Sequence, residues 1–174
     1  MENTTVNGIR IRPAHMDDLE GITEIYNEAI LTTTATFDTE QKTVEEQVEW
    51  FENHGDRYPI LVATDGKYLI FGWASLSQWS DRCAYSDTAE ISLYVKEEFR
   101  GQGIGGELMN AILLAGKEAG LHSILARVAE GNPVSVKIHE SAGFEMVGTM
   151  KEVGRKFGRL LDVHLMQLVQ GGTS

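Results

Sequence analysis

Four glycines fall within six residues, in the segment Gly101-Gln-Gly-Ile-Gly-Gly106, and Arg100 precedes them. A glycine inside a helix costs about 1 kcal/mol relative to alanine, because its backbone loses more freedom on ordering. A helix N-terminus, however, offers unpaired N–H groups and the positive end of the helix dipole, which attract phosphate. Since a predicted helix follows, the segment predicts a site where backbone N–H groups hold a phosphate or pyrophosphate.

The residues of this segment alone leave other interpretations open. The segment could be a flexible loop that happens to be rich in glycine. Gly101-x-Gly103-x-x-Gly106 also matches the dinucleotide-binding fingerprint, with Glu130 near the end of the next predicted strand as the acid that would bind a ribose. No Gly-Lys-Ser/Thr follows the glycines, which excludes the P-loop (Walker A motif) of nucleoside triphosphatases.

Glu90 is the candidate general base. It lies in the alternating segment 88–95, TAEISLYV, where Glu90, Ser92 and Tyr94 would share one face of a strand. A carboxylate in the middle of a covered sheet is desolvated, which would raise its pKa as a general base requires. The alternative is a solvated or salt-bridged residue of an ordinary strand.

His139 and Cys83 are the other side chains that could take part in chemistry. An imidazole can donate a proton near neutral pH, so His139 could act as a general acid, or it could simply pack inside a helix. Cys83 is the single cysteine, which excludes an internal disulfide and a multi-cysteine metal site. No histidine is close to it in sequence, which argues against an acyl-carrying nucleophile.

The composition is that of one globular domain of 174 residues, with 42% hydrophobic and 24% charged residues. The net charge of −11 argues against nucleic-acid binding, where Lys and Arg dominate the affinity. No apolar run approaches the roughly 20 residues that span a bilayer, and the N-terminus does not resemble a signal peptide. We therefore expect a cytoplasmic protein that binds no membrane.

Hydrophobic periodicity and turn signals predict an α+β domain over residues 1–174, in the order β-α-α-β-β-β-α-β-α-β-β. Asp65-Gly66 predicts a β-hairpin, and Asn132 followed by Pro133 predicts a helix start. Strands are expected at residues 9–12, 58–64, 68–77, 88–95, 122–129, 144–150 and 160–169, and helices at 17–31, 44–51, 108–120 and 133–142.

Five stretches carry a resemblance that extends over nearly the whole chain. They are SLYV before RGQGIGGELM, GNPVSVKIHESAGF, VGRKFGRLLDVHLMQL, IYNEAILTTTATF, and W-x-x-R-x-A-Y-x-x-T-x-E from Trp79 to Glu90. Arg100-x-x-Gly103-x-Gly105 also fits the R/Q-x-x-G-x-G/A signature of the GNAT family of N-acetyltransferases. Together these stretches resemble the branch of that family that acetylates phosphinothricin and methionine sulfoximine.

This resemblance implies a GNAT fold and a co-substrate. The fold is a central mixed, mostly antiparallel sheet with helices on both faces, splayed in a V between the strands near 88–95 and 122–129. Acetyl-CoA would lie in the split, and no metal is implied. The residues implied to contact acetyl-CoA are Leu93, Tyr94, Val95, Arg100, Gly101, Gln102, Gly103, Ile104, Gly105, Gly106, Asn132 and Ser141.

The resemblance also implies the reaction, which is direct transfer of an acetyl group to the primary amine of a small amino acid or analogue. Glu90 would be the base, His139 the acid toward the leaving thiolate, and Arg82 the partner of the acceptor carboxylate. A homodimer is also implied. The residues expected around the acceptor are Phe37, Trp79, Arg82, Tyr85, Glu90, Ser92 and Lys156.

Two alternative functions remain at this point. One is a non-catalytic acyl-CoA-binding regulatory module on the same fold. The other is an NAD-binding oxidoreductase, which would use the same glycines for a different pyrophosphate. The first alternative predicts tight CoA binding and an activity indifferent to Glu90→Gln. A thermal-shift comparison of NADH with acetyl-CoA separates the second.

Overall fold

The computed structural model describes residues 4–6 and 8–171. Within these residues, eight strands form one sheet in the order β1-β2-β3-β4-β5-β6-β8-β7. The strands are β1 (Thr4–Val6), β2 (Ile9–Pro13), β3 (Ile60–Thr64), β4 (Ile70–Gln78), β5 (Thr88–Val95), β6 (Ser123–Ala129), β7 (Glu145–Lys156) and β8 (Arg159–Val169). The helices are η1 (Met16–Asp18), α1 (Leu19–Thr32), α2 (Val44–Glu52), η2 (Cys83–Tyr85), η3 (Glu97–Phe99), α3 (Ile104–Glu118) and α4 (Pro133–Ser141).

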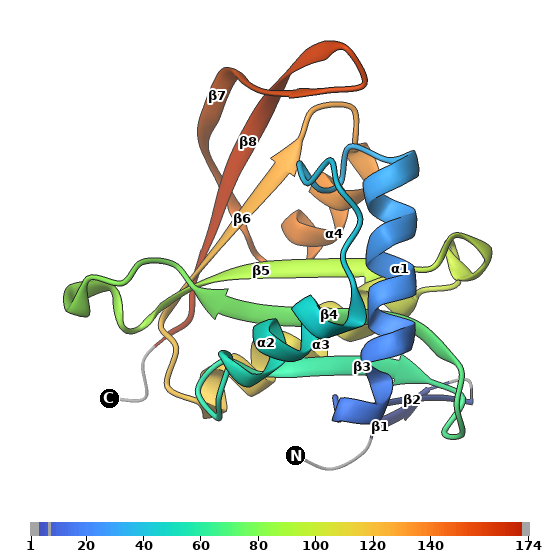
Figure 1. Cartoon of the computed structure of the whole chain (residues 1–174). Helices are drawn as coiled ribbons and strands as arrows, with labels where there is room; N and C mark the ends of the chain where they lie inside the picture. The colour runs from blue at the N-terminus through green and yellow to red at the C-terminus, as the bar shows by residue number, and fades with distance from the viewer. Residues whose placement is uncertain (1–3, 7, 172–174) are drawn as a thin grey trace.

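The sheet opens because β5 and β6 pair over a short distance. Their parallel register runs only from Thr88 opposite Ser123 to Glu90 opposite Leu125. The other strand pairs of the sheet are antiparallel. Beyond Glu90, β6, β8 and β7 diverge from the β3–β5 part of the sheet (Figure 1). The predicted V-shaped, mostly antiparallel sheet is therefore confirmed.

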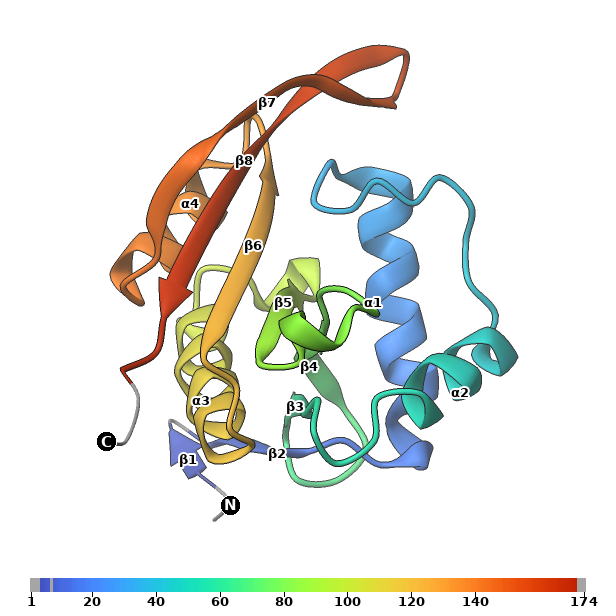
Figure 2. The same ribbon diagram turned by 90° about the vertical axis from the view of Figure 1, so that its left-hand side faces the viewer.

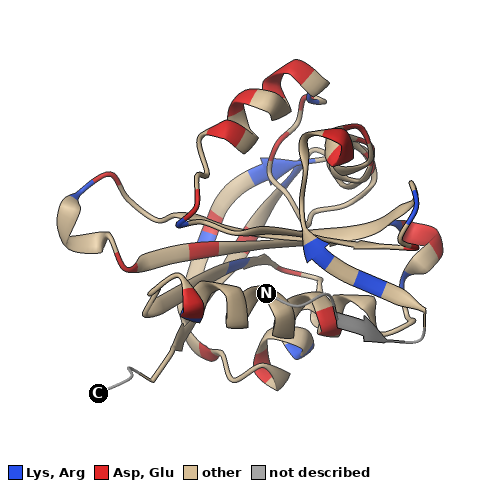
Figure 3. Cartoon of the chain, turned by 90° about the horizontal axis from the view of Figure 1, so that it is seen from below, with Lys and Arg blue, Asp and Glu red and all other residues tan. Residues whose placement is uncertain are grey.

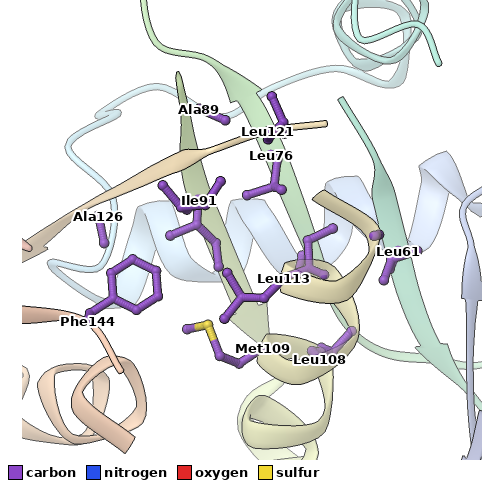
Figure 4. Close-up of a cluster of buried hydrophobic side chains, with 14 of the residues drawn as sticks. Leu61, Leu76, Ala89, Ile91, Leu108, Met109, Leu113, Leu121, Ala126 and Phe144 are labelled. Atoms are coloured by element: carbon purple, nitrogen blue, oxygen red, sulfur yellow. The ribbon is translucent and has the colours of Figure 1, made fainter. Parts of the chain in front are cut away.

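A hydrophobic core lies on each face of the sheet, as alternation along the strands requires. One core joins α3 to the sheet, with fully buried Leu76, Leu108 and Met109 (Figure 4). The other joins α1 to the opposite face through Ile22 and Trp73. Figure 2 shows α3 and α4 on one side of the strands and α1 and α2 on the other. The predicted helices on both faces are confirmed.

Three local features differ from the sequence-based prediction. Strand β1 was not predicted, and α3 begins at Ile104, one turn before the expected start. Strand β7 continues to Lys156, past its predicted end. Its register shifts between Met146 and Gly148 and again between Met150 and Gly154, so the apolar and polar residues lose the alternation that predicts a strand.

Acidic residues lie on helices, turns and strands, and α2 alone carries Glu45, Glu46, Glu49 and Glu52 (Figure 3). Within the described residues, no cluster of three or more His, Cys, Asp or Glu side chains is arranged to bind a metal ion. Among the same residues, no helix has the length and apolar character needed to cross a membrane.

Candidate active site

A cavity of about 1820 Å³ lies where the two arms of the sheet part. Pockets for drug-sized ligands hold about 300–1,000 Å³, so this cavity suits a longer ligand. Residues 90–95 of β5 line it, from the last position that pairs with β6, Glu90, along the edge where β6 no longer pairs with β5. Its other walls come from α1 and the loop after it, the start of α3, the end of β6, α4 and the β7–β8 hairpin.

The glycine turn, residues 101–106, forms one wall of the cavity. Gly101 has φ +75° and Gly103, the N-cap of α3, has φ +85°, conformations that favour glycine. A Cβ built on Gly101, Gly103 or Gly106 would have no neighbour within 4 Å, so this surface is open. The N-terminus of the fifteen-residue helix α3 is thereby exposed to the cavity, as an anion-binding site needs.

Gly105 has a different role from its neighbours. A Cβ on Gly105 would lie 3.2 Å from Cδ1 of Ile138, a side chain of α4. The absence of a side chain at Gly105 therefore allows α3 and α4 to pack closely. The sequence pattern could not tell this packing role from the role of leaving space for a ligand. Gly106 has an ordinary helical conformation, and a Cβ there would enter open space. A substitution at Gly106 would therefore fill the ligand-binding surface without straining the backbone.

Arg100 lines the cavity and also fixes the turn that precedes the glycines. Its Nε donates to the Val95 carbonyl at 2.9 Å, and its Nη2 donates to Glu28 Oε1 at 2.9 Å. The same Glu28 oxygen accepts the backbone N–H of Glu97 at 3.0 Å. Among the described residues, Gln102 is not part of the cavity lining, and its amide donates to the Glu98 carbonyl at 3.3 Å.

Glu90 and Arg127 form a bidentate ion pair on the cavity wall. Nε and Nη2 of Arg127 donate to Oε1 and Oε2 of Glu90 at 2.6 and 2.7 Å. The Glu90 side chain is 21% exposed and the Arg127 side chain 55% exposed. Hydrogen bonding to Glu90 raises the pKa of Arg127, so the guanidinium stays charged. The alternative expectation, that Glu90 is a salt-bridged strand residue, therefore describes its side chain in this structure.

The strand register explains why these two side chains meet. Glu90 pairs with Leu125, and Arg127 is the next residue of β6 whose side chain points to the same face of the sheet. Arg127 was missed because the two strands are far apart in sequence. A basic residue at an alternating polar position of β6 was the available signal. The Arg127 guanidinium also lies 5.9 Å from the ring centroid of Trp79, within reach of a cation–π contact.

His139 lies on α4, lines the cavity and is 7% exposed. Its Nδ1 lies 2.8 Å from the Ser135 carbonyl oxygen, which can only accept, so Nδ1 carries a proton. Burial lowers the pKa of His139, so the neutral ring with an unprotonated Nε2 is favoured. Such a ring has no proton to give at Nε2, and this geometry lends no support to the predicted acid role.

Asn132 and Ser141 both line the cavity, at the two ends of α4. Asn132 Oδ1 accepts the backbone N–H of Ser135 at 3.1 Å, so its side chain caps the helix as predicted. The amide nitrogen of Asn132 is directed away from this hydrogen bond by the geometry of the group. Both residues line the cavity where the resemblance implied contacts to acetyl-CoA.

Two polar residues of the loop after α1, Thr36 and Asp38, form hydrogen bonds with Tyr26 of α1 that the sequence did not indicate. Tyr26 donates to Asp38 Oδ2 at 2.8 Å and lies 3.0 Å from Thr36 Oγ1, and both partners line the cavity. Burial raises the pKa of Tyr26 to about 12. Burial also raises the pKa of Tyr94, whose ring packs edge-on against Tyr26. These phenols are therefore neutral hydrogen-bonding groups at ordinary pH.

The predicted acceptor residues divide into two groups. Phe37, Ser92 and Glu90 line the cavity. Within the described part of the chain, four other predicted residues are absent from the lining: Trp79, Arg82, Tyr85 and Lys156. The first three belong to the loop between β4 and β5, and of these Trp79 contacts a lining residue, Arg127, 5.9 Å from its ring centroid.

Lys156 is buried and has a structural contact. Its Nζ donates to the Thr36 carbonyl at 2.7 Å, and burial lowers its pKa. Beside it, the ring of Phe37 occupies the space that a side chain at Gly154 would need. These two contacts join the loop after α1 to the β7–β8 hairpin across the cavity, so Lys156 connects the walls and does not line them.

Known proteins resemble the chain over most of its length. The model of the acetyltransferase (GNAT) domain matches residues 11–165. A methionine sulfoximine/methionine sulfone acetyltransferase of Pseudomonas aeruginosa is 39% identical over 91% of this chain and 92% of the relative. A phosphinothricin N-acetyltransferase of Streptomyces coelicolor is 38% identical, and the similarity covers 89% of this chain and 92% of the length of that relative.

Solved structures agree with this assignment. A GNAT phosphinothricin acetyltransferase from Sinorhizobium meliloti, determined in complex with acetyl-CoA, has a TM-score of 0.90 and 35% identity. The similarity covers 95% of this chain and 91% of that one. The family match over residues 11–165 includes the glycine turn and Glu90. The chain therefore belongs to the acetyltransferase (GNAT) family.

Proposed function

We propose that the chain transfers the acetyl group of acetyl-CoA to the primary amine of a small amino acid or analogue. Methionine sulfoximine, methionine sulfone and phosphinothricin are the acceptors to test, since relatives are named for acetylating them. The observation that carries the proposal is one cavity lined by an open helix N-terminus, by the unpaired residues 91–95 of β5, and by the Glu90 carboxylate at the last paired position of that strand.

Acetyl-CoA fits the cavity by its chemistry. The pyrophosphate would meet the N–H groups of the glycine turn, where the absent side chains leave open space. The amide-rich arm would meet the edge of β5 at residues 91–95, which has no strand partner on the β6 side. Acetyl-CoA supplies an activated thioester, and the residues of this chain hold and orient it.

Glu90 is the proposed base. A free amine is mostly protonated at neutral pH, so a proton must leave before the nitrogen can attack the thioester carbon. Glu90 accepts this proton directly or through one water molecule. The carbon–nitrogen bond then forms, the carbon–sulfur bond breaks, and the second amine proton passes to the thiolate or to solvent. A backbone N–H near Tyr94 or Val95 is the proposed donor to the developing oxyanion.

An amine panel with thiol detection tests the function. Acetyl-CoA is mixed with methionine sulfoximine, methionine sulfone, phosphinothricin and a set of ordinary amino acids, and free thiol is followed. We expect amine-dependent thiol release and an acetylated product by mass spectrometry. Binding of acetyl-CoA without thiol release for any amine would instead support the non-catalytic module.

A thermal-shift comparison tests the co-substrate separately. Only a ligand that binds the folded state raises the melting temperature by mass action. We expect acetyl-CoA to raise it and NADH to leave it unchanged. Stabilisation by NADH alone would favour the oxidoreductase interpretation of the glycine turn.

We also propose a homodimer in which a second copy covers β7. This strand is the outer strand of the sheet and is twelve residues long. Long exposed edge strands invite pairing with another chain. Its exposed apolar side chains and those of the adjoining turn and strand are Met146, Val147, Met150, Val153, Phe157 and Leu160.

Light scattering after size exclusion tests the dimer. We expect the wild type to have the mass of two chains and Val147→Glu to have the mass of one, because the carboxylate would enter the covered surface. Leu114→Glu is the matched control, since Leu114 is equally exposed but lies on α3. A monomeric wild type, or a dimer that survives Val147→Glu and Val153→Glu together, would reject this surface.

A further inference from the structure

The Glu90–Arg127 pair places a negative and a positive group side by side on the wall of the cavity. Both oxygens of the proposed base are engaged by one guanidinium. A base in this state is less available to a substrate proton, because both of its oxygens already accept hydrogen bonds from the guanidinium. The resting arrangement therefore raises the question of what separates the two groups during turnover.

Arg127 has donors to spare for another anion. An arginine carries five N–H groups in a planar fork, and Glu90 uses Nε and Nη2. Within the described part of the chain, Nη1 donates to no acceptor, and more than half of the side chain is exposed. Its other neighbour is the ring of Trp79, whose face tolerates a cation and does not compete for hydrogen bonds.

The pair is complementary to a zwitterion. An α-amino acid carries an ammonium group and a carboxylate on one carbon atom, so the two charges lie as close together as those of Glu90 and Arg127. Entry of such a molecule exchanges one internal ion pair for two, with the ammonium on Glu90 and the carboxylate on Arg127. Ion pairs that are partly exposed are weakly held, so the exchange is accessible.

We propose that Arg127 binds the carboxylate of an α-amino-acid acceptor and thereby releases Glu90 to accept the proton of the acceptor's ammonium group. This inference rests on the proposed acetyltransferase function. It assigns the carboxylate contact to Arg127 in place of Arg82, which lies outside the cavity lining among the described residues. The ammonium proton moves to Glu90, and Glu90 returns it to solvent after product release.

Paired acceptors test this proposal. Methionine sulfone, methionine sulfoximine and phosphinothricin are each compared with their α-carboxamides, which keep the amine and lose the carboxylate charge. In the wild type we expect kcat/KM for the acid to exceed that for the carboxamide by about 100-fold, the effect of a charged hydrogen-bond pair. In Arg127→Gln we expect this ratio to fall close to one, with the KM for acetyl-CoA unchanged.

Two further variants make the result specific. Arg127→Lys keeps the charge without the planar fork, and we expect an intermediate ratio. Arg159→Gln is the matched control, because Arg159 also lies near a glutamate, Glu130, at 3.7 Å, but is not in the cavity lining of the described residues. We expect Arg159→Gln to keep the wild-type ratio. Melting curves of all variants show whether each one is folded.

The outcomes separate this inference from the proposed function. If the wild type acetylates none of the amines, the proposed function itself is wrong. If the wild type is active but accepts acid and carboxamide equally, or if Arg127→Gln keeps the full ratio while folded, the Arg127 assignment is wrong and the function stands. A ratio that falls only in the Arg127 variants supports the assignment.

Discussion

In the glycine turn the surface is made by leaving side chains out, whereas in the Glu90–Arg127 pair it is made by two side chains held against each other. The first depends on backbone dihedral angles within one short segment, with φ of +75° at Gly101 and +85° at Gly103. The second depends on the register of β5 against β6. One cavity therefore combines a locally encoded wall with a wall encoded by long-range pairing.

This difference separates the two substrates. The open helix N-terminus suits the anionic end of acetyl-CoA, and the charged pair suits the amine acceptor. Changes in the glycine turn should therefore act on the KM of acetyl-CoA. Changes at the Glu90–Arg127 pair should act on the acceptor and on the chemical step. The predictions below test this separation, from the largest expected effect to the smallest.

Glu90→Gln should have the largest effect. We expect kcat to fall by about 10²- to 10⁴-fold, because the amide cannot accept the amine proton. The KM for acetyl-CoA should stay close to its wild-type value, and steady-state kinetics with thiol detection measure both. Glu130→Gln is the control, since Glu130 lies at the next strand end outside the described cavity lining. An unchanged kcat in Glu90→Gln would show that Glu90 is not the general base.

Gly106→Ala should act on the co-substrate instead. Its methyl group would enter open space at the phosphate-binding surface, so we expect the KM for acetyl-CoA to rise by roughly tenfold, which corresponds to about 1.4 kcal/mol. The free energy of unfolding should rise by up to about 1 kcal/mol, because alanine favours a helix. Steady-state kinetics measure the expected rise in KM, and chemical denaturation measures the expected gain in the free energy of unfolding.

Gly105→Ala is the matched comparison within the same turn. Its methyl group would face Ile138 Cδ1 at 3.2 Å and not the open surface. We expect a smaller change in KM and no gain in the free energy of unfolding. If both alanine variants change KM equally, the distinction between clearance at Gly106 and packing at Gly105 is wrong.

Glu28→Gln should have a modest effect through Arg100. The substitution removes the charge that holds Arg100 beside the turn, at 2.9 Å in the wild type. We expect the KM for acetyl-CoA to rise by about 2- to 5-fold, because one partly exposed ion pair contributes about 1 kcal/mol or less. Glu24→Gln, one turn earlier on α1 and paired with Lys96, should leave KM unchanged. Equal effects of the two variants would contradict a specific role for Glu28.

His139→Gln should give the smallest effect, on the pH dependence of stability. Burial lowers the pKa of His139, so the unfolded chain takes up a proton below about pH 6.5 while the folded ring stays neutral. Stability should therefore fall as the pH drops through 6.5 toward the folded pKa, and it should fall less in the variant. Denaturation at several pH values measures the difference, and His54, whose pKa burial also lowers, remains in both proteins.

The same variant tests the acid role predicted from the sequence. With Nδ1–H committed to the Ser135 carbonyl, we expect kcat to change by less than about tenfold. Loss of a true general acid costs about 10²- to 10⁴-fold. A loss of that size in a folded His139→Gln variant would return His139 to the acid role.

The sequence by itself determined the features that depend on neighbouring residues. The glycine turn, the Asn132 cap and the alternation around Glu90 are written within a few positions, because dihedral preferences, capping and strand periodicity act over that distance. From these features and the resemblance, the sheet, its opening and the two helical layers followed correctly.

Only the tertiary structure decided which distant side chains meet. Arg127 reaches Glu90 because two strands pair for three residues and then part. Lys156 meets Thr36 through packing that has no short-range signal, and the same kind of packing buries His139, although its partner Ser135 lies only one helical turn away. A side chain's partners set its charge and its availability, so the roles of Arg127, Lys156 and His139 could not be read from residue type and spacing.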